Sequence, residues 1–293
     1  MIPAPAPGIY RNVPADVYHQ WDALNKSRLD VLQDQSPMHY RYAIAHPTPA
    51  TEDQAIGTRM HTLLFDGEAA YMRGVVIGGP INPKTQKAYG RDTNAHREWC
   101  EAQGPGKEFL SIDEDQQVRS MVKAAMDDEY VARVIGDNAE GSDNEVSMVW
   151  IDPESGLLCK GRADMLRPGL GMIGDLKTCQ DASPAAVERS ILKWGYHRQA
   201  AWYTDGARVL GLDWVRHFGF LFVEKLPPYG LGLYRIQDDA VEIGRLQNAR
   251  LRATVKQCRE SGEWPGYSNG FADIGLSAWA IRQAMNELGV TEP

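Results

Sequence analysis

The sequence is poor in cysteine and has no long hydrophobic run. Its four cysteines, at positions 100, 159, 179 and 258, form no closely spaced pair that would indicate a zinc site or a disulfide framework. No apolar stretch approaches the roughly 20 residues that span a bilayer. The N-terminus lacks the basic-then-apolar pattern of a secretory signal. We therefore expect reduced thiols in a cytoplasmic protein.

Two catalytic signatures and an excess of positive charge are also missing. There is no GxxxxGK[ST] phosphate loop and no GxSxG nucleophile turn, which argues against motor ATPases and serine hydrolases. The 31 basic residues are outnumbered by 39 acidic ones, so the formal net charge is −8. Such a chain should repel polyanions unless basic side chains gather locally or metal ions intervene.

What remains is an ordinary globular composition, with 43% hydrophobic and 24% charged residues among 293. No linker or internal repeat is visible, so we expect a single domain over residues 1–293. The Ala/Pro-rich residues 1–7 predict a flexible tail. The polar, turn-rich residues 77–106 predict an excursion or a mobile loop.

Capping residues and hydrophobic spacing predict a mixed α/β protein. Helices are expected over residues 25–36, 51–66, 183–209 and 239–260, the last followed by a short tail. Strands are expected over residues 145–151, 157–166, 172–178, 214–224 and 231–236. Only turns separate the first three strands, which predicts an antiparallel meander within a mixed central sheet flanked by helices.

Two acidic residues lie inside strands that are otherwise apolar. Asp164 lies near the end of the second meander strand, and Asp175 lies within the third, in Gly174-Asp-Leu-Lys-Thr178. We expect each carboxylate to have a charged partner or a function, because burying an unpaired carboxylate in an apolar setting costs several kcal/mol of free energy. Alternation along the strand places Asp175 and Lys177 on one face, and the hairpin can bring Asp164 beside them.

Two carboxylates and a lysine on one sheet face suit Mg²⁺, which keeps several waters and completes its shell with phosphate oxygens. The lysine is then placed to orient or deprotonate an attacking water, as in metal-assisted phosphodiester hydrolysis. Spacing alone fits a bland alternative equally well. In that alternative Asp175 and Lys177 form a surface ion pair and Asp164 is a turn acid.

The order acid, hairpin, acid-x-lysine resembles the PD-(D/E)XK nuclease superfamily, and the wider sequence resembles the RecE-type exonuclease VIII family of phages and prophages. Short motifs in a fixed order carry this resemblance over most of the chain. They include Gly8-Ile-Tyr10, Asn25-Lys-Ser-Arg-Leu-Asp30, Ser36-Pro-Met-His-Tyr40, Gly57-Thr-Arg-Met-His61, Trp150-Ile-Asp-Pro-Glu154, Arg162-Ala-Asp164, Gly174-Asp-Leu-Lys-Thr178, Tyr196-His-Arg-Gln-Ala200 and Glu263-Trp-Pro265. The resemblance implies a PD-(D/E)XK nuclease-like fold.

The resemblance also implies roles for particular residues. His61, Asp164 and Asp175 match metal ligands, the backbone carbonyl of Leu176 matches a further ligand, and Lys177 matches the active-site lysine. Taken alone, His61 is more simply read as a packed histidine on an apolar helix face.

Three further residues match positions near the metal in the family. Glu145 matches an acid that touches a second metal or a metal-bound water, although a solvated strand-end glutamate fits equally well. Gln199 and Tyr203 are four residues apart, so they share one helix face. They match a pair that touches DNA phosphate or water, with ordinary helix packing as the alternative.

The implied activity is a Mg²⁺-dependent exonuclease, with Mn²⁺ able to substitute, that digests one strand of double-stranded DNA from its ends in the 5′ to 3′ direction. The implied setting is a bacterial host or a phage, with a single-strand annealing protein of the RecT type as partner and a homo-oligomeric ring as assembly. A structure-specific endonuclease and a catalytically inactive DNA-end-binding scaffold stay open as alternatives. Basic residues near the motifs are expected to line the DNA path: Arg59, Lys160, Arg162, Arg189, Lys193 and Arg198.

Overall fold

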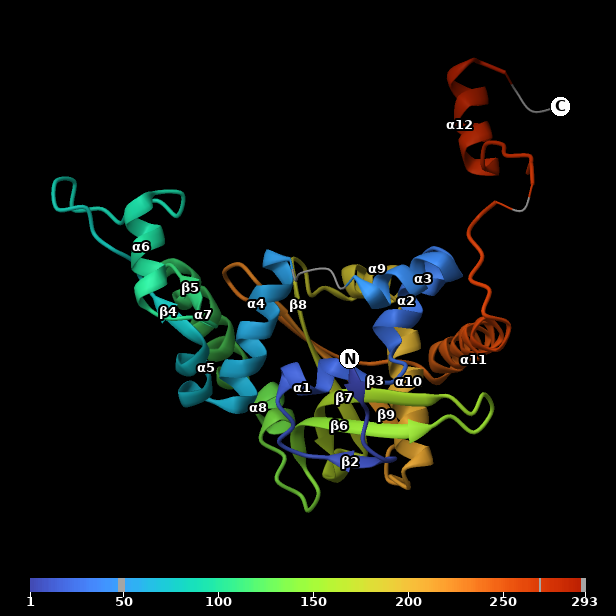
Figure 1. Cartoon of the computed structure of the whole chain (residues 1–293), viewed down its shortest axis with the longest axis horizontal. Helices are drawn as coiled ribbons and strands as arrows, with labels where there is room; N and C mark the ends of the chain where they lie inside the picture. The colour runs from blue at the N-terminus through green and yellow to red at the C-terminus, as the bar shows by residue number, and fades with distance from the viewer. Residues whose placement is uncertain (47–50, 269, 291–293) are drawn as a thin grey trace.

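The computed structural model describes residues 1–46, 51–268 and 270–290. A six-stranded mixed sheet forms its centre, in the order β10-β9-β8-β7-β6-β2 (Figure 1). The strands are β2 (Gly8–Tyr10), β6 (Asp143–Ile151), β7 (Leu158–Arg167), β8 (Met172–Cys179), β9 (His217–Glu224) and β10 (Leu231–Arg235). Neighbours are antiparallel except β8 and β9, which run parallel. The predicted mixed sheet with its antiparallel meander is thus confirmed.

The helices and two small sheets surround this sheet. The helices are α1 (Ala15–Gln20), α2 (Lys26–Asp34), α3 (Pro37–Ala45), α4 (Glu52–His61), α5 (Glu68–Gly74), α6 (Asn94–Ala102), α7 (Ile112–Asp127), α8 (Glu129–Ile135), α9 (Pro184–Trp194), α10 (Tyr196–Val209), α11 (Asp238–Ser261) and α12 (Ala278–Glu287), with a π-helical turn η1 (Thr62–Asp66) and a 3-10 turn η2 (Pro168–Leu170). The small sheets pair β1 (Ile2–Pro3) with β3 (Trp21–Asp22) and β4 (Val75–Ile77) with β5 (Glu108–Leu110). None of the described helices is both long and apolar enough to cross a membrane.

Side-chain alternation along β9 divides the core between the two faces of the sheet. Phe218 and Phe220 pack in the main cluster, which also contains Trp202 of α10. Leu221 packs in a second cluster, with Met60 of α4. The central strands are therefore covered on both faces, by α10 on one and by α4 and α7 on the other, which is why their sequences are nearly continuous apolar runs.

Local capping explains where the first helices begin. The side chain of Asn25 accepts a hydrogen bond from the backbone N–H of Arg28, at 3.1 Å, and caps α2. Thr51 and Gln54 form a reciprocal capping box at the start of α4. Both caps lie where the helices predicted over residues 25–36 and 51–66 were expected to begin.

The structure corrects the predicted course of the chain at several points. The helix expected over residues 183–209 is two helices, because Gly195 has a left-handed φ of 62° and ends α9. The strand expected from residue 214 begins at His217. The C-terminal residues were predicted as a tail but contain α12, which has no buried residue.

The predicted excursion begins and ends at paired strands, because β4 and β5 lie side by side. The segment between them projects away from the central sheet and contains α6, a helix that the sequence analysis did not predict (Figure 1). Its mobility stays a prediction. At the N-terminus, where a flexible tail is predicted, Ile2 and Pro3 pair with β3.

Candidate metal and catalytic site

The site forms where β7 and β8 separate. The two strands pair only from Met165 opposite Gly174 to Arg167 opposite Met172. Beyond this point the side chain of Asp164 takes the place of a strand partner, and its Oδ2 accepts a hydrogen bond from the backbone N–H of Leu176 at 2.7 Å. A buried backbone donor is thereby satisfied, which fixes one carboxylate beside the acid-x-lysine motif of β8.

Asp175 and Lys177 lie on the face of β8 that α10 covers. Their side chains form an ion pair, and the Gln199 side chain donates a hydrogen bond to Asp175 Oδ1 at 2.6 Å. The Lys177 ammonium also lies 5.1 Å from the centre of the Tyr196 ring. The carboxylate and the ammonium are thus held by each other and by α10.

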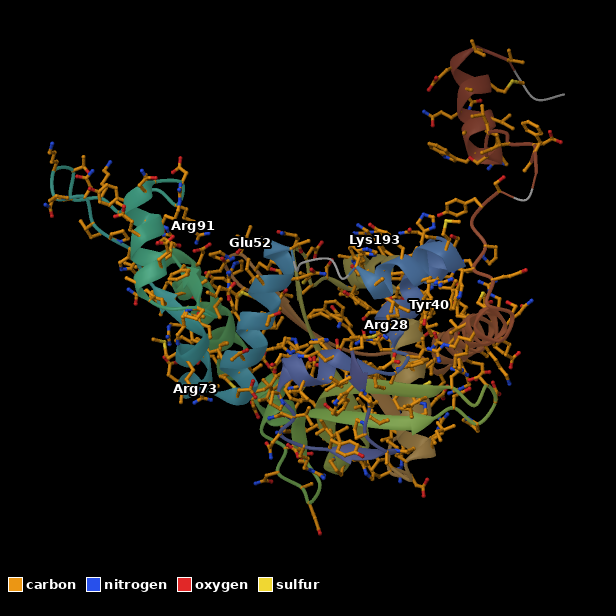
Figure 2. The ribbon with its side chains drawn as sticks, in the orientation of Figure 1. Arg28, Tyr40, Glu52, Arg73, Arg91 and Lys193 are labelled. Atoms are coloured by element: carbon orange, nitrogen blue, oxygen red, sulfur yellow. The ribbon has the colours of Figure 1, made fainter. Side chains whose placement is uncertain are left out.

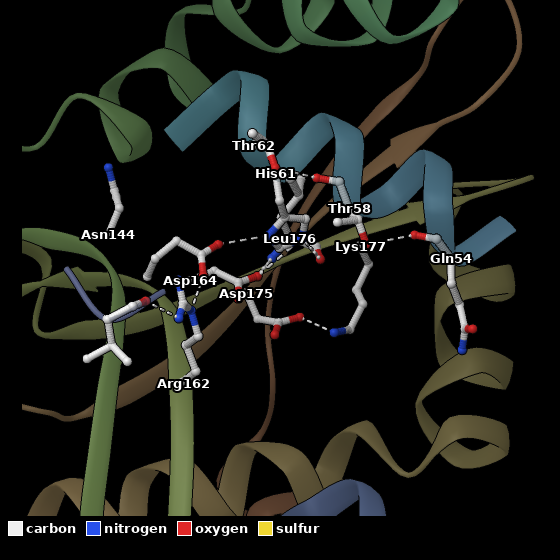
Figure 3. Close-up of polar contacts among 12 residues, drawn as sticks. Gln54, Thr58, His61, Thr62, Asn144, Arg162, Asp164, Asp175, Leu176 and Lys177 are labelled. Atoms are coloured by element: carbon white, nitrogen blue, oxygen red, sulfur yellow. Dashed lines mark hydrogen bonds and ion pairs between the residues drawn. The ribbon is translucent and has the colours of Figure 1, made fainter. Parts of the chain in front are cut away.

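His61 reaches the site from the last turn of α4. Its Nε2 lies 3.1 Å from the carbonyl oxygen of Leu176 and 3.5 Å from Asp164 Oδ2 (Figure 3). A close approach between α4 and β8 makes this possible, because a Cβ at Gly57 would lie 3.4 Å from Thr178 Oγ1. The chain continues from His61 into the π-helical turn η1, a rare conformation that is frequent at functional sites.

Glu145 lies opposite Asp164, at the position where pairing between β6 and β7 lapses. It has a left-handed φ of 52°, which costs a non-glycine residue about 1–3 kcal/mol and is typical of functional sites. Its carboxylate contacts His61 Nδ1 at 3.2 Å and accepts a hydrogen bond from Arg162 Nε at 2.6 Å. Glu145 is therefore fixed in the site by His61 and Arg162 and is not a solvated strand-end residue.

The electrostatics of the site follow from packing three carboxylates together. Burial, with a further contribution from the neighbouring Asp175, raises the pKa of Asp164 to about 7. Burial alone would lower the pKa of His61, but Asp164 and Glu145 outweigh it and raise the value to about 9. Burial also disfavours the Lys177 ammonium, yet Asp175 and Asp164 raise its pKa above the usual value. The carboxylates therefore attract positive charge strongly.

These donors fit a divalent cation. Ligand atoms of His61, Glu145 and Asp164 lie within 4.8 Å of one another. The carbonyl oxygen of Leu176 lies 3.1 Å from His61 Nε2. The carboxylate of Asp175 lies outside this group but close enough to raise the pKa of Asp164. Carboxylate, carbonyl and imidazole groups are the donor types expected for Mg²⁺ or Mn²⁺. Of the predicted metal ligands, His61, Asp164 and the Leu176 carbonyl are thus brought together with Glu145, and Asp175 lies beside them. The role of each as a ligand stays a prediction.

Tyr203 lies one turn beyond Gln199 on α10 and differs from it in setting. Its ring packs against Gly161 and lies 5.9 Å from the ring of Phe218. Burial raises the pKa of its hydroxyl well above the ordinary value. Tyr203 is thus a packed residue that adjoins the site, whereas Gln199 contacts Asp175 directly.

The predicted DNA-lining residues are mostly internal, and this part of the prediction is wrong. Lys160 is 1% exposed and donates to the carbonyl oxygens of Tyr18 and Trp21, both at 2.8 Å. Arg59 and Arg198 are also buried and form ion pairs with carboxylates. Arg162 holds Glu145. Of the six, only Arg189 and Lys193 on α9 are exposed.

The pairing of Arg162 with Glu145 was not predicted from the sequence, and Tyr196 was only a third-rank candidate there, behind Gln199 and Tyr203. Arg162 stands two residues before Asp164 and therefore on the same strand face, which is a signal that could have placed it near the site. Nothing in the sequence identifies the Tyr196 ring as a neighbour of Lys177, since their contact depends on how α10 packs on β8.

Comparisons with known proteins bear on the fold and the family of the chain. A crystal structure from Eubacterium rectale, described as a "putative exonuclease", matches with a TM-score of 0.60 and 11% sequence identity, covering 93% of this chain and 98% of that chain. At this identity the likeness shows a shared fold. No curated protein matches the sequence. The model of the PDDEXK-like domain of unknown function, DUF3799, matches residues 48–274, which include every residue of the site. The chain therefore belongs to this PDDEXK-like family and has a PD-(D/E)XK nuclease-like fold.

Proposed function

We propose that the protein is a Mg²⁺-dependent exodeoxyribonuclease of the RecE type that hydrolyses one strand of double-stranded DNA from its ends. The proposal includes 5′ to 3′ polarity, single-stranded DNA left for recombination, and substitution of Mg²⁺ by Mn²⁺. One observation carries it. His61, Asp164, the Leu176 carbonyl and the Asp175–Lys177 pair converge where β7 and β8 separate. The description of the Eubacterium rectale protein as an exonuclease supports the choice.

Hydrolysis requires a water oxygen to attack phosphorus while the bond from phosphorus to the leaving oxygen breaks. A bound divalent cation would polarise the phosphate and stabilise the charge that builds on it. His61, Asp164, Asp175 and the Leu176 carbonyl would hold that cation. Lys177, kept protonated by Asp175, can donate a hydrogen bond to the attacking water or to a phosphate oxygen. Gln199 keeps Asp175 aligned both to hold the cation and to pair with Lys177.

Assembly and partnership belong to the same proposal. A homo-oligomeric ring would keep the protein on one DNA end through many cycles. A single-strand annealing protein of the RecT type would take up the strand that is exposed. Sedimentation with and without DNA tests the ring, and co-purification tests the partner.

The test uses linear and covalently closed circular duplex DNA, each incubated with Mg²⁺ or with EDTA. We expect loss of the linear DNA in Mg²⁺ and no change in the closed circle or in EDTA. Cleavage of the closed circle would instead indicate an endonuclease with the same chemistry. Binding of ends without degradation of either substrate would indicate a scaffold. Labels at the 5′ or the 3′ end report the polarity by which label is released first.

A further inference from the structure

A pocket of about 470 Å³ lies outside the site described above, between α4 and the projecting segment that carries α6. Its lining includes four cationic side chains and two carboxylates: Arg59, Arg91, Arg97, Lys107, Glu52 and Glu108. The lining therefore has a surplus of two positive charges, in a protein whose formal net charge is −8. A locally cationic hollow on an acidic molecule favours an anionic ligand.

The two carboxylates are occupied by Arg59, which is 5% exposed. Arg59 Nη1 lies 3.1 Å from Glu52 and Nη2 lies 2.5 Å from Glu108. Its Nε has no hydrogen-bond partner among the described residues. Because one guanidinium faces two carboxylates, these three groups together carry a net charge of −1, and the other three cations supply the surplus of two positive charges.

Those three cations lie on or next to the projecting segment. Arg97 on α6 is exposed and has no ion-pair partner in the described part of the chain. Arg91 pairs with Glu114, which does not line the pocket, and Lys107 donates to the carbonyl of Arg73. Figure 2 shows Arg91 on the projecting segment and Glu52 across from it on α4.

The pocket and the metal site share one helix. Arg59 and His61 are two residues apart on α4, which is about 3 Å along the axis and roughly half a turn around it. The two sites thus lie on opposite sides of a helix about 10–12 Å wide. A DNA strand must pass around the helix, along half of its circumference, which is about 16–19 Å. At about 3.4 Å of rise per phosphate in each strand, that path spans about five phosphates. A strand bound at the metal site can reach the pocket over this length.

We propose that this pocket binds the phosphate backbone of duplex DNA a few nucleotides from the bond that is cut. The inference rests on the proposed function, because it assumes that DNA is the substrate. Backbone contacts of this kind position a duplex without reading its sequence. The projecting segment thereby serves as a clamp for DNA, and its cations Arg91, Arg97 and Lys107 supply a path that the sequence did not predict.

The test is the salt dependence of DNA binding, measured by fluorescence anisotropy with a labelled blunt duplex in EDTA so that nothing is cut. We compare wild type with the double variant Arg91→Ala/Arg97→Ala. The matched control is Lys123→Ala/Arg133→Ala, which removes two exposed cations that do not line the pocket. We expect the slope of log K against log salt to fall in magnitude by about 2 for the pocket variant. We also expect Kd to rise at least about tenfold, with the control like wild type.

Catalysis separates this role from that of the metal site. With Mg²⁺, the pocket variant should keep kcat at saturating DNA and raise KM, since its residues touch backbone away from the cut bond. If the wild-type protein degrades DNA but the pocket variant shows an unchanged slope of log K against log salt, that result would overturn the clamp and leave the proposed function standing. So would a pocket that binds dAMP or pyrophosphate, by calorimetry, without any effect on the DNA slope. A wild-type protein that neither binds nor degrades DNA would reject both proposals.

Discussion

Each acid of the site has a polar or charged partner. Asp164 accepts a hydrogen bond from the Leu176 N–H, Asp175 pairs with Lys177, and Glu145 pairs with Arg162. Because His61 touches two of these carboxylates, the site is a connected network, and removing one member leaves another buried and unpaired.

At the residue scale, Lys177→Ala should abolish most catalysis without loss of the fold. The ammonium is expected to act on the reacting phosphate or water, and loss of one such donor costs about 10²–10³ in rate. The measurement is single-turnover cleavage of linear DNA, with circular dichroism to check folding. The control is Lys123→Ala, an exposed lysine on α7. A Lys177→Ala enzyme within threefold of wild type would remove Lys177 from the mechanism.

Metal affinity should rise with pH. Burial and Asp175 raise the pKa of Asp164 to about 7, and the pKa of His61 is about 9 because Asp164 and Glu145 outweigh the opposing effect of burial. Both groups therefore hold protons near neutral pH when no cation is bound. A cation must displace these protons, so its affinity should rise by up to about tenfold per pH unit for each proton released. Mn²⁺ titration followed by electron paramagnetic resonance measures this. The same affinity at pH 6 and pH 9 would contradict the ligand set.

The sequence indicates that Asp164, Asp175 and Lys177 lie close together on neighbouring strands, because an acid inside an apolar strand is a local signal. Their roles in metal binding and catalysis stay predictions. The sequence does not decide whether Glu145 and Tyr203 act in the site or only pack in the fold. Their surroundings depend on contacts with residues distant in sequence, such as Arg162 for Glu145 and Phe218 for Tyr203. The residues expected to line the DNA path could not be predicted from the sequence for the same reason. Burial and pairing decide whether Arg59 or Lys160 can face DNA, and both depend on the folded structure.

At the element scale, Gly195 sets how α10 meets the site. Its left-handed φ of 62° ends α9, and a Cβ there would lie 2.4 Å from Arg198 Nη2. That guanidinium pairs with Asp30 of α2 at 2.8 Å. The turn thus joins α9, α10 and α2 beside the Asp175–Gln199 hydrogen bond.

Gly195→Ala should therefore destabilise the protein, by about 1–2 kcal/mol for the backbone conformation and by more for the displaced Arg198. The matched control is Gly211→Ala, where φ is 77° but a Cβ would meet nothing within 4 Å. The control should show the backbone cost alone. Differential scanning calorimetry of both variants measures the difference, and equal losses would show that the Arg198 contact contributes nothing.

Element types were predictable where the signal was local. Capping at Asn25 and Thr51, and the turns between meander strands, placed helices and strands correctly. The break at Gly195 was not predictable from the residue type alone, because glycine also occurs within helices, as Gly206 does in α10. The helix α6 has only nine residues in a polar, turn-rich segment, so composition favoured a loop there even though Thr93 caps the helix.

At the scale of the whole molecule, the C-terminus joins the domain through Trp264. Its ring stacks on Tyr40 with centres 5.6 Å apart, and the carbonyl of Pro265 accepts a hydrogen bond from the Met38 N–H at 3.1 Å. Two of the motifs noted in the sequence thus contact each other. Beyond them, none of the residues of α12 is buried.

Deletion of residues 269–293 should accordingly leave stability nearly unchanged. Trp264→Ala should lower the free energy of unfolding by about 2 kcal/mol, because it removes a ring that packs on the main cluster. For a chain of 293 residues that corresponds to a fall of roughly 3 °C in Tm. Thermal unfolding of the two proteins is the measurement. A deletion that costs as much as Trp264→Ala would show that α12 packs on the domain.

The most direct test of the central claim is the single-turnover rate of linear duplex cleavage against Mg²⁺ concentration, for wild type and for Asp175→Ala. The account predicts a rate that rises with Mg²⁺ to saturation in wild type. It predicts a rate lower by at least about 10²–10³ in the variant, since the variant loses both a metal ligand and the partner of Lys177. A rate independent of Mg²⁺, or an Asp175→Ala enzyme as fast as wild type, would contradict it.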